Sequence, residues 1–303
     1  MKAYGIVATP VTSLRRRPLD AAEADRHDEG QESQLLYNEV LLVTDETEDW
    51  LRVEALEQRK FLGPGGWGGY PGWVRRRDVA RVEEPPIYNG LIRAAYATVA
   101  ARPSADAPVL SYLSIGTKLL LRGEKKGFFE VSLAYDRVGW VLKKDATTLP
   151  SPVSTGRRAG QELADLARLF LGVPYLWGGR SMPLPASTVA AGVDCSGLVN
   201  LVFRTLGTEV PRDAHDQWLA AGRILARDLR AGDLIFLSKE GRPDSIDHVV
   251  LSLGGELFIE APQTGGTVVV RSFSERVGLD LRMLGQQGFT IGDRKLHFGR
   301  IER

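Results

Sequence analysis

Residues 192–203 read GVDCSGLVNLVF and hold the only cysteine of the 303-residue chain, Cys195, where a polar loop becomes an apolar run. The apolar residues from Leu198 to Phe203 predict a helix with a buried face, and Asp194 stands where an N-cap residue is expected. A cysteine at a helix N-terminus meets unpaired N–H groups and the positive dipole end, which favour thiolate and can hold an oxyanion. A free cysteine is as often a small buried apolar residue, so position alone leaves both interpretations open.

Length and composition narrow the class of protein. A chain of 303 residues predicts two or three domains, and its 43% hydrophobic and 25% charged residues are ordinary for a globular protein. A formal net charge of +1 gives no reason to expect nucleic acid or an anionic membrane as a partner. No apolar run reaches the length of a membrane span. We also expect a monomer.

The cysteine and histidine content argues against bound metal. One cysteine cannot form an intrachain disulfide, which is compatible with a reducing compartment. The four histidines and the single thiol lie at wide spacings without a zinc-ligand pattern. We therefore expect no metal ion and no cofactor.

The first ten residues, MKAYGIVATP, lack the long apolar core of a signal peptide. We expect a cytoplasmic protein if the chain is full length. The alternative is a protein exported to the periplasm or cell wall from which the signal has been removed.

The first half of the chain contains an internal repeat of β character. Residues 39–53 match residues 117–131, and each copy is followed by a Gly-Trp-Val triplet, at 72–74 and 139–141. Short runs rich in β-branched and aromatic residues predict strands throughout. Two copies are too few for a solenoid, so we predict two small barrels in tandem, over residues 1–84 and 87–148. The pair Pro85-Pro86 is the expected linker between them.

The two copies differ in length. Val53 precedes Trp73 by 20 residues and Val131 precedes Trp140 by 9, so the first copy carries 11 more. The extra residues are centred on LGPGGWGGYP, a glycine-rich insertion with two aromatic residues. We interpret it either as a recognition loop or as a tolerated surface insertion.

A third domain is predicted over residues 157–303. Residues 160–170 have apolar positions at helical spacing, and a second helix follows Cys195. Four later runs, at 233–237, 248–253, 256–260 and 267–270, indicate strands joined by tight turns. Helices followed by an antiparallel sheet predict an α+β domain.

His248 and Glu260 are brought together by one of the predicted hairpins. His248 lies six residues before Gly254 and Glu260 lies five residues after Gly255, so the two are near neighbours across the ladder. A carboxylate there would fix the imidazole tautomer and stabilise imidazolium. A histidine at the start of a strand is nevertheless more often structural than catalytic.

Several motifs, in one order along the chain, together resemble a known family. They are VPYLWGG at 173–179, DCSG at 194–197, VPRDA at 210–214 with Gln217, RAGDLIF at 230–236, and HVVLSLG from His248. They resemble the NlpC/P60 cysteine peptidases, papain-like enzymes that cut bacterial cell-wall peptides. The two barrels resemble bacterial SH3 domains. The three-part layout is similar to the YkfC-type dipeptidyl-peptidase VI subgroup, whose members release L-Ala-γ-D-Glu from muropeptides with a free N-terminus.

The resemblance implies roles for five residues of the third domain. Cys195 would be the nucleophile and His248 its general base, paired as thiolate and imidazolium. Glu260 would stand third, where the family often has histidine, and as a carboxylate it should raise the pKa of the histidine. Tyr175 would lie near the nucleophile and help position the carbonyl or its oxyanion. Trp177 would wall the substrate groove.

The resemblance also implies acidic groups around a free substrate amine, since a desolvated ammonium needs charged partners. Asp213 fits this role in the catalytic domain. The first barrel would contribute the cleft-closing Tyr70 and a second carboxylate. Glu32 is the candidate for that carboxylate, and Glu39 is the next choice. The alternative interpretation of either glutamate is a solvated residue at a strand end. Asp194 and Ser196 are expected to shape the site for the γ-D-Glu carboxylate and the amine. Residues 180–193 are longer than the family connection and either cover the site or loop outward.

The resulting fold class is an α+β papain-like catalytic domain preceded by two small all-β, SH3-like barrels. The expected activity is hydrolysis of the γ-D-Glu–diamino acid bond in murein peptides with a free N-terminal L-Ala. One alternative is a wall-bound peptidoglycan endopeptidase that uses the barrels as anchors. The other is a catalytically silent peptidoglycan-binding protein, against which the intact Cys195 and His248 argue.

Overall fold

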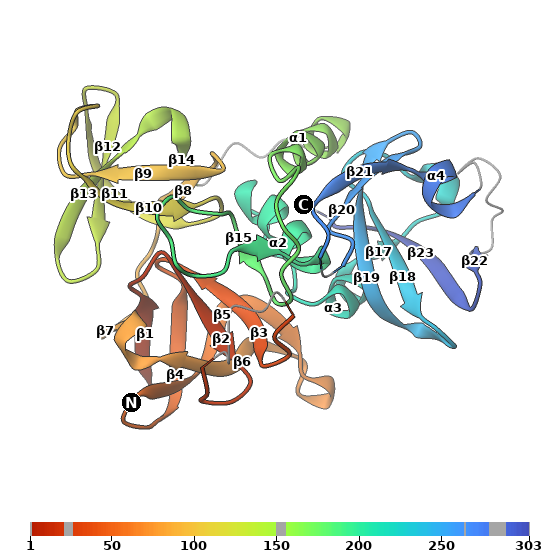
Figure 1. The fold of residues 1–303 in the computed structure, drawn as a ribbon, viewed down its shortest axis with the longest axis horizontal. Coiled ribbons are helices and arrows are strands. Elements are labelled where there is room, and N and C mark those ends of the chain that lie inside the picture. Colours follow the sequence, from red (N-terminus) through yellow and green to blue (C-terminus); the bar gives the residue numbers. More distant parts are fainter. Residues whose placement is uncertain (1, 21–26, 150–155, 264, 279–288, 303) are drawn as a thin grey trace. The chain divides into compact units, whose positions relative to one another are not determined.

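The structure is a computed structural model that describes residues 2–20, 27–149, 156–263, 265–278 and 289–302. It divides into two compact units. Unit 1 comprises residues 1–151 and 176–192, and unit 2 comprises residues 152–175 and 193–303. The chain therefore leaves unit 2 after Tyr175 and returns to it at Val193 (Figure 1).

Unit 1 opens with a first β domain made of one antiparallel sheet. Its strand order is β3-β2-β6-β5-β4-β1-β7. Apolar and polar residues alternate along β5, where Leu51, Val53 and Ala55 are buried and Arg52 is exposed, so one face packs on the domain core. The strands are β1 (Ala3–Val7), β2 (Val11–Arg15), β3 (Gln31–Leu36), β4 (Val40–Glu46), β5 (Trp50–Phe61), β6 (Trp67–Arg75) and β7 (Val79–Val82).

The second β domain repeats this arrangement. Its strand order, β10-β9-β13-β12-β11-β8-β14, is the first order with each strand number raised by seven. A 3₁₀ turn ending in aspartate precedes the last strand in both domains, at Arg76–Asp78 and Lys143–Asp145. The predicted repeat is confirmed as two small antiparallel β domains. The strands are β8 (Gly90–Ile92), β9 (Tyr96–Ala100), β10 (Val109–Ser114), β11 (Lys118–Lys125), β12 (Phe128–Leu133), β13 (Arg137–Leu142) and β14 (Ala146–Thr148).

The extra residues of the first copy lengthen a hairpin. Strands β5 and β6 have 12 and 9 residues, whereas β12 and β13 have 6 each. Pairing resumes after a register shift between Ala55 and Arg59, and the hairpin closes through a 3₁₀ turn at Gly63–Gly65. Much of the predicted insertion is therefore paired strand, since residues 67–69 pair with residues 59–61. Phe61 and Trp67 are in ring contact at its tip, with centroids 5.4 Å apart.

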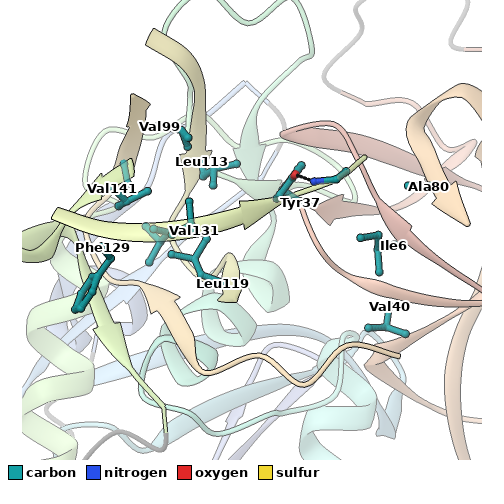
Figure 2. Packing of buried hydrophobic residues seen from close by; sticks show 13 residues of the cluster. Ile6, Tyr37, Val40, Ala80, Val99, Leu113, Leu119, Phe129, Val131 and Val141 are labelled. Carbon is teal, nitrogen blue, oxygen red and sulfur yellow. Dashed lines mark hydrogen bonds between the residues drawn. The ribbon is translucent and has the colours of Figure 1, made fainter. Parts of the chain in front are cut away.

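One hydrophobic core is shared by the two β domains (Figure 2). Ile6, Tyr37 and Val40 from the first domain belong to the same buried cluster as Val131 and Leu119 from the second. The Tyr37 hydroxyl accepts a hydrogen bond of 2.6 Å from the Ala134 backbone N–H. A buried tyrosine needs such a partner for its polar end, so this contact fixes one domain on the other within unit 1.

Residues 176–192 pack against the first β domain through buried polar contacts. Arg180 forms an ion pair with Glu39, and both side chains are fully buried. The Gln34 amide accepts from the Arg180 backbone N–H at 2.9 Å and from the Ser181 hydroxyl at 2.8 Å, and donates to the Ala190 carbonyl at 2.7 Å. This segment, named the strap below, contains β15 (Arg180–Ser181) and the first residue of β16 (Gly192–Val193). The strap lies within the range that the sequence assigned to the catalytic domain.

In unit 2, helices α1, α2 and α3 precede an antiparallel sheet and α4 follows β21, which agrees with the predicted α+β domain. Its helices are α1 (Gly156–Arg168), α2 (Cys195–Thr205), α3 (Ala214–Ala220) and α4 (Phe273–Val277). The sheet order is β17-β23-β18-β19-β20-β21, with β22 paired to β23. The strands are β17 (Gly222–Arg223), β18 (Leu234–Lys239), β19 (Arg242–Gly254), β20 (Leu257–Glu260), β21 (Val269–Ser272), β22 (Thr290–Ile291) and β23 (Arg294–Arg300). No helix among the described residues is both long and apolar enough to cross a membrane.

We expect the buried strap contact to contribute strongly to the stability of unit 1. The substitution Glu39→Gln removes the carboxylate charge that faces buried Arg180, which should cost about 3–5 kcal/mol of unfolding free energy. The control Asp20→Asn alters an ion pair with Arg75 in which Asp20 is 63% exposed, and should cost less than about 1 kcal/mol. Urea unfolding followed by tryptophan fluorescence measures both. Equal, small losses would contradict the assignment.

Candidate active site

The N-terminus of α2 carries the cysteine, as the apolar run after it predicts. Cys195 is the first residue of the helix and is 8% exposed. Asp194 is the N-cap, and its Oδ1 accepts from the Gly197 backbone N–H at 2.6 Å. This bond satisfies one of the N–H groups that a helix start leaves unpaired. The sulfur is thereby held at the positive end of the helix dipole.

Arg212 holds the loop before the nucleophile, a role that the sequence did not reveal. Its Nη1 donates to Asp194 Oδ1 at 3.0 Å and its Nη2 donates to Oδ2 at 2.7 Å. Nη1 also donates to the Ser196 hydroxyl at 2.9 Å. Arg212 is 1% exposed, so this bidentate pair is buried. Asp194 and Ser196 are thus bound by the protein itself, and their predicted contact with substrate stays a prediction.

His248 and Glu260 are in direct contact. The β19–β20 register pairs Leu251 with Ile259, which places Glu260 opposite Val250 and diagonal to His248. His248 Nε2 lies 3.0 Å from Glu260 Oε2, and Glu260 is 1% exposed. The hairpin contact expected from the sequence is present.

The charges around His248 stabilise its protonated form. Burial opposes the charge, but the Cys195 sulfur, through its charge and a hydrogen bond, and Glu260 outweigh burial and raise the His248 pKa to about 9. For Glu260, burial acts to raise the pKa, and the hydrogen bond and charge of His248 with the charges of Arg276 and Arg271 lower it overall. At neutral pH the pair is therefore imidazolium and carboxylate.

Tyr175 lies within electrostatic reach of the nucleophile in unit 2. Its phenol is buried, and burial followed by the charges of Asp194 and Cys195 raises the pKa of its hydroxyl. The hydroxyl stays protonated at any physiological pH and can donate a hydrogen bond. Its backbone N–H donates to the Gly266 carbonyl at 2.8 Å, which anchors the residue. Asp213 is the N-cap residue of α3 and is half-buried.

Three further predicted residues, Tyr70, Glu32 and Trp177, lie in unit 1. The Tyr70 hydroxyl donates to Glu32 Oε2 at 3.3 Å, so the structure brings these two together. Lys60 Nζ lies 4.3 Å from the Tyr70 ring centroid. Arg16 forms an ion pair with Glu32, whose side chain is 21% exposed.

The fallback carboxylate is unsuited to its predicted role. Glu39 is fully buried and bound to Arg180 and Gln58, so Glu32 is retained as the candidate for the substrate amine. Trp177 is 37% exposed, and its carbonyl accepts a hydrogen bond of 2.6 Å from Gln31 Nε2. Its predicted position along a substrate groove stays a prediction.

The unit 2 constellation has the parts required for covalent acyl transfer. A thiol at a helix start, an imidazolium hydrogen-bonded to it, and a buried carboxylate behind the imidazolium make an activated nucleophile with its own acid–base group. The described residues contain no group of three or more His, Cys, Asp or Glu side chains that could hold a metal ion.

Comparison with known proteins agrees with this geometry. The family model described as "NlpC/P60 family" matches residues 172–281. The chain is 30% identical over 247 residues to a Bacillus subtilis protein named gamma-D-glutamyl-L-lysine dipeptidyl-peptidase, which covers 81% of this chain and 77% of that protein. The chain belongs to the NlpC/P60 family. It is accordingly a cysteine peptidase.

Two further comparisons differ in how much of the chain they cover. A crystal structure of an NlpC/P60 family protein from Bacillus cereus covers 98% of this chain and 99% of its own, with a TM-score of 0.78 and 22% identity. Peptidoglycan endopeptidase RipB of Mycobacterium tuberculosis is 34% identical over 147 residues, covering 44% of this chain and 59% of RipB. The first likeness shows that the fold of nearly all of this chain has a solved counterpart.

We expect Glu260→Gln to lower the His248 pKa from its value of about 9, because the amide still accepts a hydrogen bond but carries no charge. Imidazolium would then be lost at lower pH. At alkaline pH the rate of Cys195 alkylation by iodoacetamide changes as His248 loses its proton. In Glu260→Gln this alkaline limb of the pH profile should lie at lower pH than in the wild type. Glu240→Gln, which removes an exposed charge of the same unit, is the control. An unmoved limb in Glu260→Gln would contradict the pairing.

Proposed function

We propose that this peptidase hydrolyses the γ-D-Glu–diamino acid bond of murein peptides with a free N-terminal L-Ala and releases L-Ala-γ-D-Glu. The observation that carries the proposal is the continuous contact from Cys195 through His248 to the buried Glu260 carboxylate. The name of the Bacillus subtilis relative supports the bond and the dipeptide product. The diamino acid is meso-diaminopimelate or L-lysine.

The chemistry follows from the charge arrangement. The Cys195 thiolate attacks the γ-carbonyl carbon of D-Glu, and the carbonyl oxygen gains the negative charge. The Cys195 backbone N–H and the Tyr175 hydroxyl are the donors we assign to that oxyanion. When the C–N bond breaks, His248 gives its proton to the leaving amine, and the acyl group remains on sulfur as a thioester. Water, deprotonated by His248, then attacks the thioester, and cleavage of the C–S bond releases the dipeptide and restores the thiolate and the imidazolium.

Selection of the free amine is assigned to acidic side chains. An ammonium that leaves water needs anionic or polar partners. Asp213 is the candidate in unit 2, and Glu32 with its Tyr70 partner is the candidate in unit 1. In this proposal Arg16 gives up its exposed contact with Glu32 when the substrate ammonium arrives. Peptides without a free N-terminus would leave these carboxylates without a cationic partner.

A second candidate function is cleavage of intact peptidoglycan. It is favoured by the 34% identity to a peptidoglycan endopeptidase, which extends over 44% of this chain. This function requires a site that accepts blocked N-termini. It therefore predicts a different response to acetylation of the substrate amine.

The test compares L-Ala-γ-D-Glu-meso-diaminopimelate with its N-acetylated form, using mass spectrometry. We expect cleavage of the free peptide and at least about a tenfold lower kcat/KM for the acetylated one, which corresponds to about 1.4 kcal/mol. Glu32→Gln and Tyr70→Phe should raise KM for the free peptide and leave the acetylated peptide unaffected. Equal cleavage of both peptides would support the endopeptidase instead.

The nucleophile and base assignments have their own test. We expect Cys195→Ala and His248→Ala each to lower kcat by about a thousandfold or more, because neither a second thiol nor a second base can substitute. Thermal unfolding of each variant checks that the fold is retained. Substantial turnover by either folded variant would refute the mechanism.

A further inference from the structure

The two oxygens of Glu260 have different environments. Oε2 contacts His248 Nε2 at 3.0 Å. Oε1 lies 3.0 Å from Arg271 Nε and 3.7 Å from Arg276 Nε, yet it accepts no hydrogen bond from the described residues. The two arginines therefore act on this oxygen through charge. A buried carboxylate is costly unless its charge is compensated, and here the compensation comes from three cations.

The local fold delivers both arginines to this oxygen. Strand β21 pairs Val269 with Glu260, so Arg271 is the diagonal neighbour two residues along and its long side chain reaches back. Helix α4 begins directly after β21 with a capping box between Ser272 and Glu275, which sets the position of Arg276 in its last turn. The two side chains are 44% and 50% exposed, whereas Glu260 is 1% exposed.

The charged groups near Glu260 come from every element that packs on it. His248 and Asp247 lie on β19, Arg271 on β21, Arg276 and Glu275 on α4, and Arg294 on β23. Asp247 neutralises Arg294 in an ion pair, and the Arg271 charge also acts on Glu275. Cys195, on α2, acts on His248 from its other side. Among these groups, Arg271 and Arg276 are the cations within 4 Å of Oε1.

We propose that Arg271 and Arg276 are positioning residues that hold Oε1 of Glu260 so that Oε2 faces His248, and that their charges weaken the hold of the carboxylate on the imidazolium proton. This inference rests on the proposed roles of Cys195 and His248. A glutamate in the third position adds a full negative charge beside imidazolium. With nothing to offset that charge, His248 would release its proton reluctantly to the leaving amine. The arginines supply the offset from the side of the carboxylate remote from His248.

The experiment measures kcat/KM against pH for Arg271→Gln, Arg276→Gln and the double variant. Loss of a positive charge raises the pKa of every group near it, His248 included. The alkaline limb should therefore move to higher pH, by about half a unit for each half-exposed arginine. The maximal kcat should fall several-fold. Arg271→Lys should restore the wild-type limb, and Arg227→Gln, which removes an exposed charge of unit 2, should leave the profile unchanged.

Two results would overturn the inference. The first is a lower maximal kcat with an unmoved alkaline limb of kcat/KM, which would mean that the arginines are only structural. The second is movement of that limb to lower pH. Alkylation of Cys195 by iodoacetamide, followed over the same pH range, separates this inference from the proposed substrate. If the alkylation limb moves as expected while the murein peptide is not cleaved, the positioning role stands and the proposed substrate is wrong. If the peptide is cleaved and neither limb moves, the proposed function stands and the positioning role is wrong.

Discussion

The contact between His248 and a carboxylate that is 1% exposed is the interaction on which the catalytic unit depends. A buried carboxylate keeps its charge only if positive groups surround it. The fold meets this requirement by placing Glu260 on β20, between the β19 strand that carries His248 and the β21–α4 segment that carries two arginines. Positive and negative groups therefore alternate from the arginines through Glu260 and His248 to Cys195. The arrangement that compensates the buried charge of Glu260 also activates the nucleophile.

The strap is the second of the two chain segments that make up unit 1. Its residues are anchored on the first β domain by the buried Arg180–Glu39 pair and by Gln34. Both of its ends continue into active-site residues, Tyr175 before it and Asp194 two residues after it. These buried contacts within unit 1 account for the ordered, hydrogen-bonded course of the segment.

Much of the architecture could be predicted because it depends on local patterns. The repeat at 39–53 and 117–131 has a strand alternation that survives in β4–β5 and β11–β12. The turn at Gly254-Gly255 was enough to bring His248 to Glu260, despite a bulge between Ser252 and Gly254. The N-cap at Asp194 followed from the apolar run behind Cys195.

The features that sequence did not reveal depend on long-range contacts. Arg212 was identified only as part of a motif, and the residue that it binds, Asp194, lies 18 positions away in the sequence. Glu39 looked like a solvated strand end until Arg180, 141 residues away, was placed against it. Strand β23 enters the sheet between β17 and β18, yet its sequence, RKLHFGR, is mostly polar. Charged residues are usually exposed, so a sequence pattern predicts that they face solvent. A charged residue that is buried by a partner far away in the sequence therefore cannot be recognised from the pattern.

The central claim is that His248 is an imidazolium held between Cys195 and Glu260 at neutral pH. The most direct test is an NMR titration of the His248 ring nitrogens in the 303-residue chain. We expect the ring to remain protonated through neutral pH and to titrate with a pKa of about 9. Titration near the ordinary histidine value of about 6.5 would contradict the claim and leave Cys195 without its charged partner.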